Sequence, residues 1–132
     1  MTNREIRAIA VRQSAVDSNC RPEDFACTEH KVVLSVKHAN AARYLEPPFV
    51  CIFTSYGSKV FASVCAGLAP LARSYLVRVS AAQCFEPPNL HILSGMLRPK
   101  GLDVCNMAEY FLPDLDLLKP LPCALELRVL ER

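Results

Sequence analysis

The sequence has no hydrophobic run that approaches the roughly 18 residues needed to cross a membrane. Its first residues, MTNREIRAIAVRQ, mix charged with apolar side chains, so they do not resemble the hydrophobic region of a secretion signal. It also lacks a basic block: acids and bases are interspersed and the net charge is +2, which gives no electrostatic basis for binding nucleic acid. We therefore expect a cytoplasmic protein with neither a membrane nor a nucleic acid as partner.

Patterns that hold metals or form disulfides are missing as well. The seven cysteines are an odd number, separated by wide, irregular gaps without a Cys-x-x-Cys pair. The three histidines, His30, His38 and His91, are scattered. Cys84 and His91 lie seven residues apart across a Pro-Pro break, so nothing orients them as a catalytic pair. We expect packed, reduced thiols and no metal site.

A hydrophobic content of 52% in 132 residues predicts one folded domain rather than a disordered chain. Thr2 and Glu5 form a capping-box pattern that opens a helix ending near residues 17–19. Pro22 and the acids after it predict a short second helix, residues 22–26. Apolar residues at helical spacing predict two more helices, over residues 68–79 and residues 87–100.

Strands are predicted by β-branched runs and by alternation. Residues 31–36 form one strand, residues 83–86 a short one, and residues 102–114 a long one. In that long strand Tyr110 shares a face with apolar residues and is expected in the core, whereas Glu109 is expected on a solvated edge. Leu125, Leu127 and Val129 alternate with charged residues, which predicts a further strand at the end of the chain.

The segment FVCIFTSYGSKVFASVC predicts a hairpin with a two-residue turn at Gly57-Ser58. Folded at that turn, Phe53 pairs with Ala62 and Cys51 pairs with Val64. Both faces of the hairpin are apolar enough to need a cover, so helices are expected on each side of the sheet. The predicted fold class is α+β, with a mixed or mainly antiparallel sheet flanked by helices.

Several strings in this order resemble the N-terminal domain of a group of bacterial GNAT-family N-acetyltransferases. They are EIRAIAVRQSAVDSNCRPEDF, YLEPPF, SYGSKVFASV, CFEPPNLH, MAEYFLPD and CALELRVLE. The resemblance implies a GNAT-like domain over residues 1–118, followed over residues 119–132 by a linker and the first strand of a catalytic core that the chain does not contain. Arg21 departs from the small N-cap residue usual in those proteins, which affects only the second helix.

The element order up to Leu112 also resembles a GNAT core that has lost its first strand. In such a core, a loop of the type Gln/Arg-x-x-Gly-x-Gly/Ala holds the pyrophosphate of acetyl-CoA with backbone N–H groups at a helix N-terminus. The matching residues here are Cys65, Ala66, Gly67, Leu68 and Ala69. Val64 replaces the polar first residue and Pro70 has no N–H to donate. An ordinary strand-to-helix turn remains the alternative.

The acid and base that GNAT chemistry commonly uses are not at the corresponding places. KVFASVC, the strand before the loop, contains no carboxylate, and PPNLHILSGML, the last helix, contains no Tyr. We therefore expect an accessory domain that does not itself catalyse acetyl transfer and whose partner is a downstream GNAT core. The alternatives are a stand-alone acyl-CoA-binding protein that uses the Gly67 loop, and a small cytosolic interaction module that forms homo-oligomers. A domain without its partner should expose apolar surface and self-associate.

Overall fold

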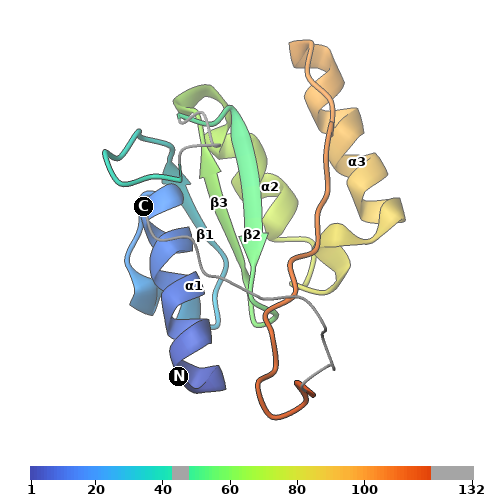
Figure 1. Cartoon of the computed structure of the whole chain (residues 1–132). Coiled ribbons are helices and arrows are strands. Elements are labelled where there is room, and N and C mark those ends of the chain that lie inside the picture. Colours follow the sequence, from blue (N-terminus) through green and yellow to red (C-terminus); the bar gives the residue numbers. More distant parts are fainter. Residues whose placement is uncertain (43–47, 120–132) are drawn as a thin grey trace, which may run out of the picture.

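The computed structural model describes residues 1–42 and 48–119. Its helices are α1 (Asn3–Asp17), α2 (Ala69–Leu76) and α3 (Pro87–Leu97), and its strands are β1 (Lys31–Leu34), β2 (Cys51–Ser55) and β3 (Val60–Val64). Short 3₁₀ helices connect them: η1 (Pro22–Ala26), η2 (Ala66–Leu68), η3 (Gln83–Phe85) and η4 (Arg98–Lys100). Figure 1 shows the sheet between α1 on one side and α2 on the other, with α3 beyond the edge of β2.

Helix α1 begins and ends where its sequence signals predict. The Thr2 hydroxyl accepts from the Glu5 amide at 3.3 Å, and the Glu5 carboxylate accepts from the Thr2 amide at 2.6 Å, which confirms the capping box. At the other end Asn19 adopts a left-handed conformation with φ 57°, and the Cys20 amide bonds back to the Ala15 carbonyl at 2.9 Å. This is the Schellman arrangement, with Asn in the position that glycine usually takes.

The second predicted helix is a 3₁₀ helix, η1. The Arg21 side chain does not cap it. Instead the Asp24 carboxylate accepts from the Arg21 backbone N–H at 3.0 Å, so this helix is capped from within its own first turn. Phe25 and Asp24 are buried, which fixes η1 against the sheet although it is only five residues long.

The three strands form a mixed sheet in the order β1-β3-β2. Strands β2 and β3 are antiparallel with Cys51 opposite Val64 and Phe53 opposite Ala62, which confirms the predicted hairpin register. The ladder ends at Ser55 and Val60, so the connection has four residues rather than the two predicted. Strand β1 runs parallel to β3 and ends at Leu34, two residues earlier than predicted.

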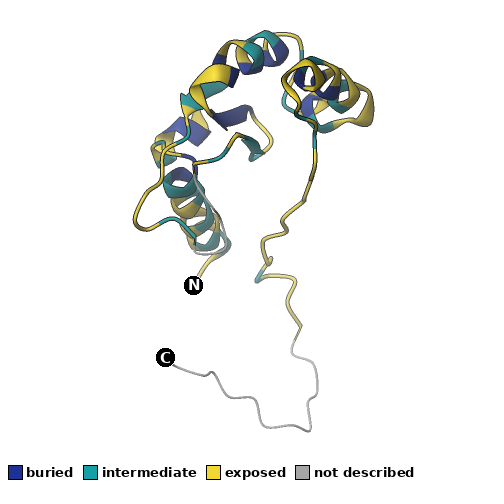
Figure 2. Ribbon diagram, turned by 90° about the horizontal axis from the view of Figure 1, so that it is seen from above, coloured by how far each residue is buried: buried dark blue, intermediate teal, exposed yellow. Residues whose placement is uncertain are grey.

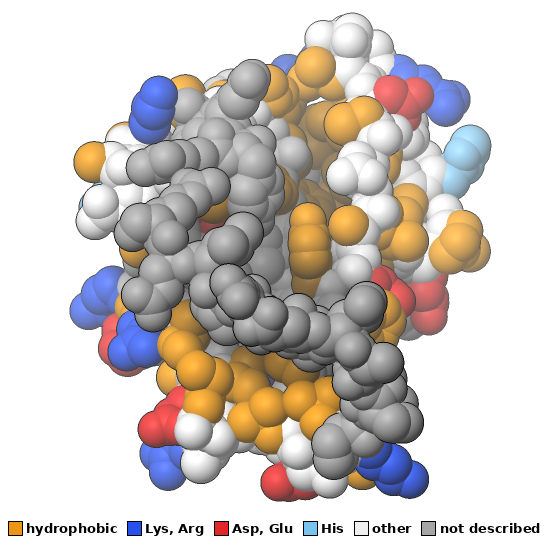
Figure 3. All heavy atoms as spheres, viewed as in Figure 1, with side chains coloured by type: hydrophobic (Ala, Val, Ile, Leu, Met, Phe, Trp, Pro, Cys, Tyr) orange, Lys and Arg blue, Asp and Glu red, His pale blue; other side chains and the backbone are white. Residues whose placement is uncertain are grey.

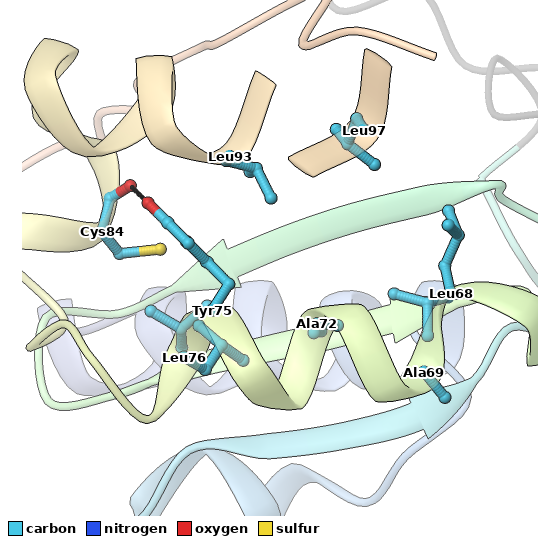
Figure 4. Close-up of a cluster of buried hydrophobic side chains, with 11 residues drawn as sticks. Leu68, Ala69, Ala72, Tyr75, Leu76, Cys84, Leu93 and Leu97 are labelled. Atoms are coloured by element: carbon cyan, nitrogen blue, oxygen red, sulfur yellow. Dashed lines mark hydrogen bonds between the residues drawn. The ribbon is translucent and has the colours of Figure 1, made fainter. Parts of the chain in front are cut away.

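Each face of the sheet packs against helices, as predicted from the apolar character of the hairpin. On one face, buried side chains of β3 meet α2 and α3; Figure 4 shows Leu93 and Leu97 of α3 opposite α2. On the other face, Phe61 packs against Phe25 of η1 and Ala15 of α1. The centroids of the Phe25 and Phe61 rings lie 5.2 Å apart.

Tyr75 organises the α2 side of the core. It is 1% exposed, its ring stacks on Phe53 of β2 with centroids 5.9 Å apart, and its hydroxyl donates to the Cys84 carbonyl at 2.8 Å (Figure 4). The residues around Cys84 form the 3₁₀ helix η3, so the short strand predicted for residues 83–86 is wrong. The Tyr75 bond instead holds a tight turn between α2 and α3.

The long strand predicted for residues 102–114 is also wrong. These residues follow the left-handed Gly101 and run without regular structure along the outside of the molecule (Figure 2). Tyr110, expected in the core, is 82% exposed, and Glu109 is exposed as expected. Alternation alone does not make a strand, because the segment needs a neighbouring edge with which to form hydrogen bonds.

The structure therefore confirms an α+β class with a small mixed sheet and helices on both faces. None of the described helices has the length and apolar character needed to cross a membrane. The strand predicted at the end of the chain lies outside the described residues.

Candidate functional site

The predicted acetyl-CoA loop lies at the end of β3, directly before α2. Its first residue continues the hairpin, because the Cys65 amide donates to the Val50 carbonyl at 2.9 Å. Cys65, Ala66 and Gly67 are exposed, whereas Leu68 and Ala69 are buried in the core. Because β1 and β3 are parallel, this loop lies at their carboxyl ends, the end at which open α/β sheets bind ligands.

The backbone donors of this loop are partly used within it. The Leu68 amide donates to the Cys65 carbonyl at 3.0 Å and the Ala69 amide donates to the Ala66 carbonyl, while Pro70 has no N–H. A Cβ atom at Gly67 would meet nothing within 4 Å, so close packing does not demand a glycine there. The geometry is that of a 3₁₀ turn entering a helix, with an exposed first half.

A hollow of about 540 Å³ lies at the other end of the parallel strands, between the start of β1 and the end of α2. It holds one carboxylate, one guanidinium and one imidazole among apolar side chains. The residues that line it are Thr28, Glu29, His30, Val32, Arg73, Leu76, Val77 and Val79.

His30, the imidazole of this hollow, is engaged through both ring nitrogens. Its Nδ1 accepts from the Val60 amide at 2.9 Å, so the proton is on Nε2, which donates to the Val79 carbonyl at 2.9 Å. The ring thereby ties the chain before β1 to the start of β3 and to the turn that follows α2. Because both nitrogens are occupied, His30 has a structural role, which its isolated position in the sequence did not reveal.

A second polar link joins η1 to β1. The Lys31 ammonium lies 2.6 Å from the Asp24 carboxylate, which is only 6% exposed as a residue. The hydrogen bond from Lys31, followed by that from the Arg21 backbone amide, holds the pKa of Asp24 below its ordinary value of 3.8. Asp24 is therefore an ionised structural carboxylate rather than a proton acceptor.

The described cysteines are free thiols. Burial raises the pKa of Cys20, Cys51 and Cys84 from 9.0 to about 11 in each case. A thiol with so high a pKa is a poor nucleophile. Cys84 is completely buried while His91 is exposed, which gives no support to a Cys–His pair.

Comparison with protein-family models, with curated proteins and with solved structures yields no significant match for this chain.

The described residues contain no group of three or more His, Cys, Asp or Glu side chains placed to hold a metal ion. Sequence reasoning missed the two polar links, His30 with Val60 and Asp24 with Lys31, because each joins residues from different elements.

Proposed function

We propose that this chain is an accessory domain of a GNAT-type N-acetyltransferase, in which a separate catalytic core transfers acetyl from acetyl-CoA to an amine. The resemblance of its strings to such domains is one support. The other is the kind of polar groups it has: His30 and Asp24 are both engaged in holding the fold together. The role that suits such a chain is packing beside the core and forming part of the acceptor side.

The observation that favours a packing role is that the described sheet has unpaired strands at both edges. Only β3 is paired on both sides, so within residues 1–42 and 48–119 the strands β1 and β2 each keep one unpaired edge. An open edge carries N–H and C=O groups that a neighbouring strand can pair with, and proteins usually cover such edges. The catalytic core is the neighbour that the resemblance provides.

The decisive experiment begins with the coding sequence beyond Arg132. We expect it to encode a helix preceded by a Gln/Arg-x-x-Gly-x-Gly/Ala loop, and we expect the joined protein to release coenzyme A from acetyl-CoA in the presence of polyamines or aminoglycosides as trial acceptors. Thiol release is the readout. The proposal would be overturned if the reading frame beyond Arg132 encodes no such core and no neighbouring gene encodes one.

Calorimetry with acetyl-CoA separates this function from the stand-alone acyl-CoA binder. We expect no binding heat from the folded chain alone. If heat appears, Gly67→Val and the matched control Gly95→Val test where it comes from, since a Cβ atom meets nothing within 4 Å at either position. Binding lost only in Gly67→Val would establish the alternative function in place of the proposed one.

A further inference from the structure

Residues 104–118 expose many large hydrophobic side chains in a short stretch. Tyr110 is 82% and Phe111 87% exposed, and four other large hydrophobic residues are exposed as well: Met107, Leu112, Leu117 and Leu118. An aromatic side chain buries about 150–250 Å², so Tyr110 and Phe111 together offer about 300–500 Å². The four aliphatic side chains add to this area, and each partner in a stable interface buries roughly 800 Å².

This segment is held at both ends. Leu102 and Val104 pack against the core cluster that includes α2 and α3. At the other end the Asn3 side chain donates to the Asp114 carboxylate at 2.7 Å and accepts from the Leu115 amide at 2.8 Å. A segment fixed in this way loses less conformational entropy on binding than a free tail would.

A hollow of the right size for one aromatic ring lies near the Asn3 contact. Its volume is about 130 Å³, and cavities of about 150 Å³ hold benzene. Two of its walls are fixed, because Phe25 and Tyr56 pack edge to face at 5.3 Å and the Tyr56 hydroxyl hydrogen-bonds to Ser14 at 2.8 Å. The residues that line it are Arg7, Val11, Pro22, Phe25, Ala26 and Tyr56.

The segment and the hollow carry opposite charge. Residues 104–118 include three acids and no base, whereas Arg7 lines the hollow and Arg4 and Arg12 are exposed on the same helix. Figure 3 shows hydrophobic side chains gathered beside the N-terminal part of α1, with charged groups around them. Apolar contact at the centre with complementary charge at the rim is the usual composition of a specific interface.

We propose that two copies of the chain associate by inserting Phe111 of each copy into the hollow beside Arg7 of the other. Arg7 lies one helical turn after Asn3, and Asn3 binds Asp114, three residues beyond Phe111. The projecting ring and the hollow are therefore at the same end of each copy. A two-fold axis at that end lets both contacts form together and closes the assembly as a dimer. The dimer does not depend on the proposed function.

Sedimentation velocity of the full chain, from about 1 to 300 µM, tests this association over the range of moderate interface affinities. We expect a reversible monomer–dimer equilibrium that weakens with added salt. Phe111→Ala should raise the dimer dissociation constant at least about tenfold, as the loss of a central aromatic anchor does. Val77→Ala is the matched control: Val77 is 82% exposed but lies in the hollow between β1 and α2, so the equilibrium should not change.

A second variant examines the receiving side. Ala26 is exposed at the end of η1, and Ala26→Leu should occupy the hollow and weaken the dimer as Phe111→Ala does, with an unchanged circular dichroism spectrum. A monomer over the whole range, a dimer that neither variant weakens, open-ended association, or equal weakening by Val77→Ala would each overturn the proposal.

Discussion

The amide of Val60 donates to Nδ1 of His30 at 2.9 Å across thirty residues of sequence. Val60 is fully buried, so its amide N–H would lack a hydrogen-bond acceptor if the His30 ring were removed. The second ring nitrogen donates to the Val79 carbonyl, and one side chain thus connects β3 to the turn that follows α2. The parallel pair β1–β3 begins at this connection.

His30→Ala should therefore lower the free energy of unfolding by about 2–3 kcal/mol, because it removes two hydrogen bonds and leaves a buried amide without a partner. Urea unfolding followed by circular dichroism measures the change. His91→Ala, at an exposed histidine of α3, is the control and should change the stability by less than about 0.5 kcal/mol. Equal effects of the two substitutions would contradict a structural role for His30.

Lys59 is the opposite case, a buried cation to which residues 1–42 and 48–119 offer no hydrogen-bond acceptor. It is 2% exposed and its ammonium lies 5.9 Å from the centre of the Phe61 ring. Lys59→Met keeps the apolar stem and removes the desolvated charge, so the protein should gain on the order of 1 kcal/mol. Thermal and urea unfolding measure the gain. Lys37→Met, at an exposed position, should leave stability unchanged; a loss of stability in Lys59→Met would refute this account.

Asp24 should make the protein sensitive to acid. Its pKa is lower in the folded than in the unfolded state, because Lys31 and the Arg21 amide donate to it. The resulting stabilisation is present above about pH 4, the unfolded value, and is lost as the pH falls through the lower folded value. Asp24→Asn should cost about 1–2 kcal/mol at pH 7 and make stability less dependent on pH below about pH 4.

Urea unfolding at a series of pH values measures both effects of Asp24→Asn. Glu23→Gln is the matched control, since Glu23 precedes Asp24 in the chain and its own carboxylate is exposed. A pH dependence that persists unchanged in Asp24→Asn would show that other carboxylates cause it.

Asparagine at position 19 should stabilise the protein more than alanine would, because of the backbone conformation at the end of α1. Its φ of 57° is costly for a residue with an ordinary side chain, and its side-chain amide donates to the Leu34 carbonyl at 3.1 Å. Asn19→Ala should cost about 1–2 kcal/mol, while Asn19→Gly, which adopts this conformation freely, should cost about 1 kcal/mol or less. Urea unfolding of the wild type and the two variants measures their order of stability. An Asn19→Ala variant as stable as the wild type would contradict this prediction.

The elements that sequence reasoning found are those whose signals are local. The capping box of Thr2 and Glu5, the apolar stripe of α2 and the register between Cys51 and Val64 each depend on residues close together in the chain. The prediction of a strand over residues 102–114 was wrong because a strand there would need a sheet edge formed by residues distant in the chain. The acetyl-CoA loop was placed correctly between a strand and a helix, but its binding function stays a prediction.

The sequence by itself determined the helices α1, α2 and α3, the hairpin and its two apolar faces, because short-range spacing and burial preference act within a few residues. Only the tertiary structure decided that β1 lies parallel to β3, that His30 and Asp24 serve the fold, and that Phe111 projects from an exposed segment. Those outcomes depend on contacts between residues far apart in the chain, whose formation is governed by the packing of the whole domain and by the hydrogen-bond partners that each buried group finds there.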